Sequence, residues 1–513
     1  MLVALGIAVA AATALPVAYL ALTIAQSWGD AVETLARERT LRLVLRSAGL
    51  AIAVSAGAAA IALPLAWLTG RTDLPGRRVW TVLAVLPLVV PSYIGAYLVV
   101  SALSPRGLLQ GLLEGPLGIE RLPSIYGFWG AWLTLTLFTY PLLLLTLRAS
   151  LGRLDPQLEE AARGMGRSPW STYRTIVVPQ LIPALGAGGL LVALYTLSDF
   201  GAVSILRFDS FTRVIYSSYR TSFDRTGAAT LAALLIVSMA IALWFEGSTR
   251  RSRARHRAGP GSARPPASTP LGRWRWPALG FCAAVVLLAL GLPLAVLIYW
   301  STRSFAGAAD WPAIAAAAGN SLLFAGLAAV GAAACAIPVA LLAVRFPSRL
   351  STLVERLAYS GYALPGIVVA LALVFFGTRV ALPLYQTAAM LVFALVVLFL
   401  PQAVGATSAS LLQVPPRLEE AARGLGRSPL AVFATITAPL ARGGVFAGAA
   451  LVFLTAAKEL PATLLLAPIE LDTLATEIWH STTVSFFERG AVPSLVLLAI
   501  SAVPLYLLAT REG

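Results

Sequence analysis

Residues 154–169 read LDPQLEEAARGMGRSP, and residues 414–429 read VPPRLEEAARGLGRSP. Twelve of the 16 positions are identical at an offset of 260 residues, although the string mixes acidic, basic, apolar and turn-forming residues. Neither chance nor low complexity produces such agreement, so the sequence contains an internal duplication. Towards the N-terminus of each copy the offset becomes 274, which relates Ser47 to Ser321. The sequence therefore predicts a tandem repeat that carries this polar segment once in each half.

Long apolar runs surround both copies of the polar segment. Of the 513 residues, 58% are hydrophobic and 12% are charged, and the mean hydropathy is +0.82. Soluble domains contain about a quarter charged residues, so this composition excludes an ordinary water-soluble protein. Because a bilayer requires about 20 apolar residues per spanning helix, the runs predict an all-α polytopic membrane protein with about 12 transmembrane helices. The expected spans are 2–24, 44–69, 79–103, 125–147, 180–198, 227–245, 277–300, 318–344, 357–378, 380–411, 443–466 and 490–509.

The spans divide into two halves, residues 1–246 and 277–513. Six spans per half is an even number, so both polar segments face the same side and the six-helix repeats are parallel. The first run has no basic segment before it, and we expect a membrane helix there rather than a signal peptide. Residues 247–276 are rich in Arg, Pro and Gly and lack an apolar period, which is typical of a flexible linker. A nucleic-acid-binding arm is the alternative. However, a connector between spans on the cytoplasmic side is expected to be basic without any such function.

The charge distribution orients the chain in the membrane. The formal net charge is +15, from 38 basic and 23 acidic residues. With both termini and the linker inside, the inside segments hold 24 basic and 9 acidic residues, and the outside segments hold 14 of each. The whole excess then lies on the cytoplasmic side, as the positive-inside rule requires. We therefore expect a multi-pass protein of a bacterial plasma (inner) membrane, with both termini and the linker in the cytoplasm. We expect the protein to contact membrane lipid and to bind no nucleic acid.

The duplicated polar segment carries its own helix signals. Asp155 followed by Pro156 predicts a helix N-terminus, with Glu159 and Glu160 near the positive end of the helix dipole. Gly166 ends this short helix, and the Ser-Pro pair that follows starts another. Two short helices with a glycine elbow would form a rigid knob on the cytoplasmic surface. Because the knob is duplicated, we expect a duplicated partner surface, and a purely structural connector is the alternative.

The spacing within each copy resembles a known motif. From Glu160 the order is Glu-Ala-Ala, three residues, Gly166, nine residues, an Ile, two residues and Pro179, and Glu420 starts the same order. This resembles the EAA loop of permease subunits of binding-protein-dependent ABC importers with the type I, MetI-like fold. The resemblance implies that each loop forms a coupling helix that docks on one of two cytoplasmic ATPase subunits. The loops are 153–179 and 413–439, and the implied coupling residues are Glu160, Ala161, Ala162, Gly166, Pro179, Glu420, Ala421, Ala422, Gly426 and Pro439.

No ATP-hydrolysing site is expected on this chain. A Walker A phosphate-binding loop needs Gly-Lys followed by Ser or Thr, whereas the only Lys, Lys458, lies between Ala457 and Glu459. ATP with Mg²⁺ would therefore be bound by the partner ATPase, and the chain itself would need no cofactor. With only two His, His256 in the linker and His480 far from it, and only two Cys, we expect neither a catalytic site nor a metal site.

Charged residues at the ends of two equivalent spans are candidates for the translocation pathway. Asp199 ends the fifth predicted span, and Lys458 and Glu459 lie at the same place, 260 residues later, in the eleventh. A charge near the middle of a membrane costs about 2.5–3.5 kcal/mol on insertion scales, which makes these residues functional candidates. We expect Asp199 and Glu459 to face one central pathway. A water-exposed helix end, or a local ion pair at Lys458, is the alternative.

Three further strings bear on the transported solute. SDFGAVS at 198–204, KELPATLLLAP at 458–468 and LDTLATEIW at 471–479 resemble the corresponding strings of fused ferric-iron permeases. The resemblance implies that a periplasmic binding protein delivers ferric iron, and carboxylate oxygens suit a hard cation. Fused permeases also serve thiamine and phosphonate importers, so these solutes stay open. An ion-coupled secondary transporter is the alternative from a different class, although such a carrier needs no paired docking loops.

Overall fold

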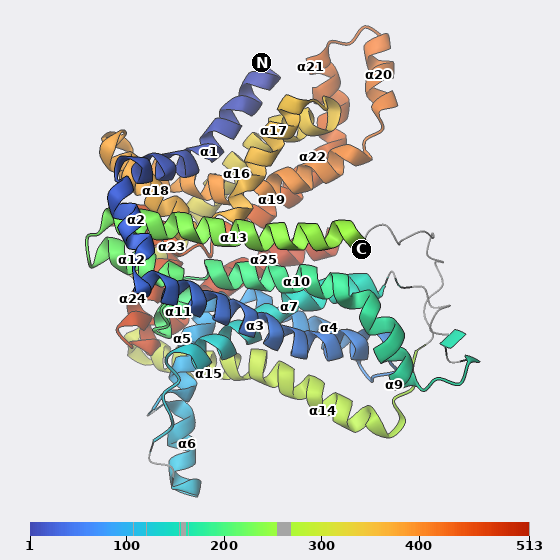
Figure 1. Ribbon diagram of the computed structural model, residues 1–513, viewed down its shortest axis with the longest axis vertical. Coiled ribbons are helices and arrows are strands. Elements are labelled where there is room, and N and C mark those ends of the chain that lie inside the picture. Colours follow the sequence, from blue (N-terminus) through green and yellow to red (C-terminus); the bar gives the residue numbers. More distant parts are fainter. Residues whose placement is uncertain are drawn as a thin grey trace. The chain divides into compact units, whose positions relative to one another are not determined.

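The computed structural model describes residues 1–105, 107–118, 121–152, 154, 161–162, 164–253 and 268–511. Within these ranges the regular structure is helical, apart from one isolated bridge between Thr72 and Thr269 (Figure 1). Nine of the described helices are long and apolar enough to cross a membrane, and two bent helix pairs raise that number to as many as 11. The predicted all-α polytopic fold is confirmed.

The spanning helices follow the predicted apolar runs. In the first half they are α1 (Leu2–Gln26), α3 (Glu38–Arg71), α7 (Phe128–Leu151), α10 (Val178–Ser198) and α13 (Arg225–Arg253). In the second half they are α14 (Arg275–Val286) continued by α15 (Leu292–Arg303), α16 (Trp311–Arg345), α19 (Ala388–Gln413) and α22 (Ala438–Ala456). The last predicted span, 490–509, lies within α25 (Phe487–Arg511).

Two of the predicted spans are bent pairs of helices. The first pair is α4 (Arg77–Val85) and α5 (Ser92–Leu103), whose segments meet at a bend of 97°. The second pair is α17 (Arg349–Ala358) and α18 (Gly366–Arg379), whose segments meet at a bend of 107°. In both pairs a proline, Pro91 or Pro365, precedes the second helix with φ −58°. Proline has no N–H to continue a helix and holds the preceding residue in an extended conformation, so it sets the bend.

The eleventh predicted span, 443–466, is wrong at its C-terminal end. α22 stops at Ala456, and a separate short helix, α23 (Pro461–Leu466), begins after the charged turn. In the first half α10 likewise stops at Ser198 before the short helix α11 (Gly201–Ile205). The apolar run continues through the break in the second half, but Pro461 at the first helical position restarts the helix there.

The helices form two compact units that exchange their first spans. One unit comprises Met1–Leu35, Ile215–Ile236 and Arg303–Gly513, and the other comprises Ala36–Val214 and Val237–Thr302. Within the first unit α1 packs against α16, α17 and α18, and within the second α14 packs against α3 and α4. The first span of each sequence half therefore packs with helices of the other half. The predicted halves 1–246 and 277–513 describe the sequence repeat, and neither coincides with a compact unit.

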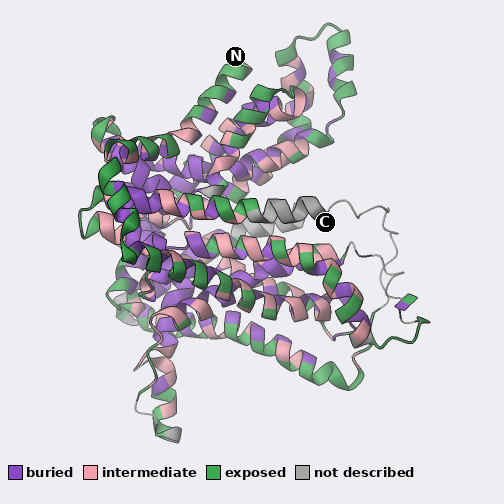
Figure 2. Ribbon diagram, viewed as in Figure 1, coloured by how far each residue is buried: buried purple, intermediate pink, exposed green. Residues whose placement is uncertain are grey.

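Burial distinguishes the outer spans from the bent pairs. α1 and α14 carry exposed residues along their length (Figure 2), and the exposed fraction of Leu287, just after α14, is 63%. Such apolar exposure suits contact with lipid. In contrast, every residue from Ser92 to Ala102 in α5 and from Ile367 to Phe375 in α18 is buried. α5 packs against α11, and α18 packs against α23, so the bent pairs place the two short broken helices inside their units.

Candidate functional site

The second copy of the duplicated segment forms the two short helices that the sequence predicts. α20 (Pro416–Gly424) has a proline at its first position and Glu419 in its first turn. Gly426 follows with φ +82°, in the left-handed region that glycine adopts without strain. The hydroxyl of Ser428 then caps α21 (Pro429–Val432) by accepting a backbone N–H at 3.3 Å. Local sequence signals are therefore sufficient to build this knob.

The described part of the first copy has the same elbow. Gly166 has φ +80°. Arg167 donates from Nη1 to Thr175 Oγ1 at 3.0 Å, and the equivalent Arg427 donates to Thr435 Oγ1 at the same 3.0 Å. In both copies a π-helical turn then leads into the following span, and such turns occur frequently at functional sites. From the elbow glycine onward the two loops thus share backbone geometry as well as sequence.

Glu419 anchors α20 to the spans of its own unit. Its carboxylate accepts hydrogen bonds from Arg345 Nε at 3.0 Å, from Arg423 Nη2 at 3.3 Å and from Thr437 Oγ1 at 3.0 Å. Arg345, the last residue of α16, also donates from Nη2 to the carbonyl oxygen of Val414 at 2.9 Å. This cluster joins the loop to three spans, since Val414 follows α19 and Thr437 precedes α22. Arg345 was not predicted from the sequence, in which it is simply an Arg at the end of a span.

The predicted coupling alanines and glutamates divide into exposed and buried residues. Glu420 and Ala421 are exposed on α20, whereas Ala422 is buried. In the first copy Ala161 is exposed and Ala162 is buried. The alanine at the third motif position therefore packs inward in both copies. The first two motif positions of the second copy are free to contact a partner.

Further exposed residues extend this surface. Pro179 and Pro439 are exposed near the entries to α10 and α22, and Glu160 lies outside the described residues. Met165 and Leu425, which the sequence analysis missed, occupy the same position in the two copies and are 73% and 84% exposed. A large apolar residue next to the elbow glycine of a polar loop was the signal that could have identified them.

Asp199 and Glu459 both cap the short helix that follows their span. Asp199 is buried, and its Oδ1 accepts the backbone N–H groups of Ala202 at 3.0 Å and Val203 at 3.3 Å. Glu459 Oε1 accepts the backbone N–H of Ala462 at 3.2 Å. These N–H groups belong to the first turns of α11 and α23 and have no partner within their own helix. The two carboxylates are therefore equivalent in structure as well as in sequence position.

The residue that faces each carboxylate differs between the halves. Ser92 and Gly366 are the first residues of α5 and α18, at an offset of 274. The Ser92 side chain lies next to Asp199. A Cβ atom added to Gly366 would lie 2.3 Å from Glu459 Oε1. The longer Glu459 side chain thus fills the space that a serine side chain occupies beside the shorter Asp199.

The three candidate pathway residues are divided between the two compact units. Asp199 and Glu459 belong to different compact units, so their meeting in one pathway stays a prediction. Lys458 is partly buried, and none of the ion pairs among the described residues includes it. In the part of the chain that the structure describes, no group of three or more His, Cys, Asp or Glu residues could hold a metal ion.

The comparison with protein families identifies the chain. The model described as binding-protein-dependent transport system inner membrane component matches residues 37–252 and 335–511. The chain belongs to this family. The permease contains the MetI-like domain twice, and both matched ranges include a duplicated loop and a broken helix end. The family consists of permease subunits of ABC importers, which are multi-pass inner-membrane proteins and not enzymes.

Several curated permeases resemble this one. The Fe(3+)-transport system permease protein FbpB 2 of Haemophilus influenzae is 34% identical over 480 residues, which cover 93% of this chain and 91% of the relative. The molybdenum transport system permease protein ModB of Escherichia coli is 30% identical over 220 residues, 40% of this chain and 95% of the relative. A probable sulfate transport system permease protein, cysT of Chlorokybus atmophyticus, is 27% identical over 35% of this chain and 63% of its own length. Of these three, the iron permease matches across both halves.

Proposed function

We propose that this permease carries ferric iron into the cytoplasm after delivery by a periplasmic binding protein. The observation that carries the proposal is the similarity to the H. influenzae Fe(3+) permease across 93% of the chain, both halves included. The molybdenum relative covers 40% of the chain, so its similarity supports the shared permease domain and does not indicate a solute. Thiamine or a phosphonate is the alternative cargo, and nothing in the described residues favours either.

Two ATPase subunits drive transport in this proposal, one at each duplicated loop. The supporting features are the exposed Glu420 and Ala421 and the exposed apolar pair Met165 and Leu425. A large apolar side chain that is 84% exposed, as Leu425 is, marks a surface for a protein partner when it lies in a polar loop. ATP and Mg²⁺ bind to the ATPase, so the loops transmit movement and take no part in the chemistry. Both termini and the linker lie in the cytoplasm, on the same side as the loops.

Asp199, Lys458 and Glu459 line the route of the solute in this proposal. They follow spans α10 and α22 at equivalent positions, next to the N-termini of α11 and α23. One oxygen of each carboxylate, Oδ1 of Asp199 and Oε1 of Glu459, accepts the helix-cap hydrogen bonds. A carboxylate has a second oxygen that can accept further contacts.

Uptake measurements test the proposed cargo. Cells that lack their own iron and molybdate importers would express this permease with the ATPase and binding protein of its own system. We expect uptake of radioactive ferric iron and none of radioactive molybdate. Molybdate or thiamine uptake without iron uptake would overturn the proposed cargo. A permease without its ATPase provides the control, because transport then lacks a source of energy.

A further inference from the structure

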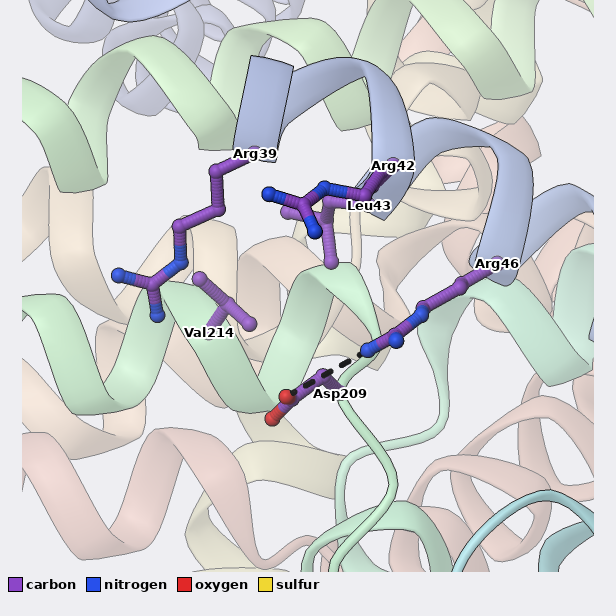
Figure 3. Close-up of a pocket in the computed structure, with 6 residues that line it drawn as sticks. All are labelled: Arg39, Arg42, Leu43, Arg46, Asp209 and Val214. Atoms are coloured by element: carbon purple, nitrogen blue, oxygen red, sulfur yellow. Dashed lines mark ion pairs between the residues drawn. The ribbon is translucent and has the colours of Figure 1, made fainter. Parts of the chain in front are cut away.

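An arginine-lined pocket lies at the end of α3 remote from the duplicated loop (Figure 3). α3 has 34 residues, so its two ends are about 50 Å apart. At its C-terminal end Arg71 donates to the carbonyl oxygen of Leu151 at 2.8 Å, where α7 leads into the first loop. At its N-terminal end is a cavity of ≈ 230 Å³. The lining residues all belong to one compact unit and are Arg39, Arg42, Leu43 and Arg46 of α3, with Asp209 and Val214, the latter on α12 (Phe211–Arg220).

The pocket has more positive than negative charge. Its three arginines extend from one side of α3 towards Asp209 and Val214 (Figure 3). Arg46 pairs with Asp209 at 3.9 Å, and Arg213 pairs with the same carboxylate, so one Asp serves two arginines. Among the described residues, the one ion pair of Arg42 is with the exposed Glu38, at 3.6 Å, and Arg39 takes part in none. Exposed ion pairs of this length are weak, so the guanidinium groups can still bind a ligand that pairs with them more strongly.

The second half has the same scaffold without the arginines. Ser47 Oγ accepts the N–H of Phe211 at 3.2 Å, and the equivalent Ser321 Oγ accepts the N–H of Leu474 at 2.9 Å. These twin hydrogen bonds align α3 with α16 and α12 with α24 (Leu474–Thr483). On that alignment the equivalents of Arg39, Arg42, Arg46 and Asp209 are Ala313, Ala316, Asn320 and Asp472.

The contact between the third and fourth of these positions shows that the fold does not need an arginine at the third. Asn320 Nδ2 donates to the backbone carbonyl of Asp472 at 2.8 Å, at the place where Arg46 pairs with Asp209. In the second half a neutral side chain therefore joins α16 to the loop that precedes α24. The junction itself thus does not require Arg46.

The equivalent end of the second half is acidic. Burial raises the pKa of Glu477 above its usual range, and the nearby carboxylates of Asp472 and Asp310 raise it further, whereas His480 and Arg489 lower it. Asp472 and Asp310 thus both lie close enough to Glu477 to repel its negative charge. The same structural position is positive in the first half and negative in the second.

The location of the arginines is unfavourable for membrane insertion. In the proposed orientation this end of α3 lies outside the cytoplasm, and the positive-inside rule disfavours arginine next to a span on that side. Three arginines in the first turns of one span therefore indicate a function that offsets this bias. Guanidinium groups bind carboxylates through two parallel hydrogen bonds, which makes a carboxylate the fitting ligand for this pocket.

We propose that the pocket formed by Arg39, Arg42 and Arg46 binds a carboxylate on the surface of the soluble binding protein. Because the equivalent surface of the second half is acidic, the partner distinguishes the two halves and docks in one orientation. The inference rests on the proposed function, which supplies the binding protein and the orientation of α3. It commits to a protein carboxylate because charge complementarity is what differs between the halves, whereas a lipid surface would surround both.

The test uses the full permease with its ATPase in nanodiscs of neutral phosphatidylcholine. The probe is the purified binding protein of the same transport system, loaded with ferric iron, and the affinity is measured at several NaCl concentrations. We expect the triple variant Arg39→Gln, Arg42→Gln, Arg46→Gln to bind at least about tenfold more weakly and to lose most of the salt dependence. The matched control is Arg77→Gln, Arg78→Gln on α4, at the opposite end of the same unit, which should leave the affinity unchanged.

Two further variants distinguish a loss of binding from a folding defect. The triple Arg→Lys variant retains the charge but loses the paired hydrogen bonds, so it should fall between the wild type and the Gln variant. The triple variant Ala313→Arg, Ala316→Arg, Asn320→Arg adds positive charge to the second half, and it should also weaken binding, because its acidic surface is then neutralised. Basal ATPase activity should be unchanged in both, which reports that the assembly is intact.

The outcomes separate this inference from the proposed function. Normal binding by the Gln variant would overturn the inference and leave the proposed function standing. Equal weakening by the α4 control would overturn it as well, because any loss of positive charge would then suffice. If the variant differs from the wild type only in nanodiscs that contain phosphatidylglycerol, the arginines bind lipid and the inference is wrong. Failure of the wild type to bind the loaded protein at all would overturn the proposed function itself.

Discussion

Arg345, the last residue of α16, and Glu419, in the first turn of α20, form an ion pair with a distance of 3.0 Å between Nε and Oε1. The exposed fractions of the two side chains are 12% and 6%. The pair lies where the second duplicated loop meets the spans, and Glu419 directly precedes Glu420, the first residue of the motif. Two adjacent glutamates thus have different environments, one turned inward to the spans and one exposed.

Loss of Arg345 should loosen the loop. Arg345→Met leaves the buried carboxylate of Glu419 without its main counter-charge, and breaking a buried pair in this way costs about 3 kcal/mol of stability. We expect a lower thermal midpoint in detergent and faster protease cleavage at Arg423 and Arg427. The double variant Arg345→Met, Glu419→Gln should recover part of the loss, because removing both charges is far less costly.

The adjacent glutamates provide a matched pair for coupling. Glu419→Gln should lower thermal stability and uncouple ATP hydrolysis from the binding protein. Glu420→Gln should leave stability unchanged and weaken ATPase docking, measured by co-purification of the ATPase. If the two variants behave alike in both measurements, the division between an anchor and a docking residue is wrong.

The elbow glycines should resist substitution because of their backbone conformation. Gly166 and Gly426 have φ +80° and +82°, and the space around each is open. A side chain at either position would therefore strain the backbone but would not clash with a neighbouring atom. Alanine in the left-handed region costs about 1–2 kcal/mol. Gly426→Ala should reduce ATP-dependent uptake. Gly426→Asp should reduce it as well, because Asp tolerates the left-handed region better than Ala but adds a negative charge to the loop. Gly424→Ala is the control, since Gly424 also has open space but is helical, and uptake by this variant should be normal.

The complementarity of Gly366 and Glu459 predicts a rescue. Gly366→Ser alone forces its Cβ against Glu459 Oε1, an overpacking that costs about 1–3 kcal/mol. Adding Glu459→Asp shortens the acid and recreates the arrangement of Ser92 and Asp199. The double variant should therefore have a higher thermal midpoint than Gly366→Ser. A double variant that is less stable than either single variant would contradict the equivalence of the two sites.

Neutral amides separate capping from a role in the pathway. Asp199→Asn and Glu459→Gln keep an oxygen that accepts the backbone N–H groups, but they remove the negative charge. If the carboxylates contact the solute, iron uptake should fall by at least about tenfold, as for the loss of a contact worth about 1.4 kcal/mol, while the thermal midpoint stays near that of the wild type. Normal uptake by the double variant would leave only the capping role.

The acidic end of the second half should make stability depend on pH. Burial raises the pKa of Glu477, and the neighbouring Asp472 and Asp310 add to this effect, so the folded chain holds the proton more tightly than the unfolded chain does. Stability is therefore lost as the pH rises above the ordinary glutamate pKa of about 4.3. Glu477→Gln should be more stable than the wild type at neutral pH, by about 1–2 °C, and equally stable below that pKa. A constant difference across the pH range would contradict this cause.

Features set by neighbouring residues were predictable from the sequence. The spans follow from runs of apolar residues, and the bends at Pro91 and Pro365 follow from the missing N–H of proline. The elbow at Gly426 follows from glycine between two helix signals. The end of span eleven was placed too late, because the apolar run continues past Ala456 while the helix does not. The offset of 260 also paired Asp199 with Glu459 correctly as equivalent residues.

The tertiary structure decided which distant residues meet. The sequence by itself determined the duplication, the spanning helices and the shape of the loops, because each depends on the types and spacing of residues close together in the chain. Only the fold showed that α1 packs with helices of the other half, that Glu419 reaches Arg345, and that Glu459 occupies the space above Gly366. Such contacts join residues many positions apart, and their energy depends on shape and charge in three dimensions, which spacing along the chain does not encode.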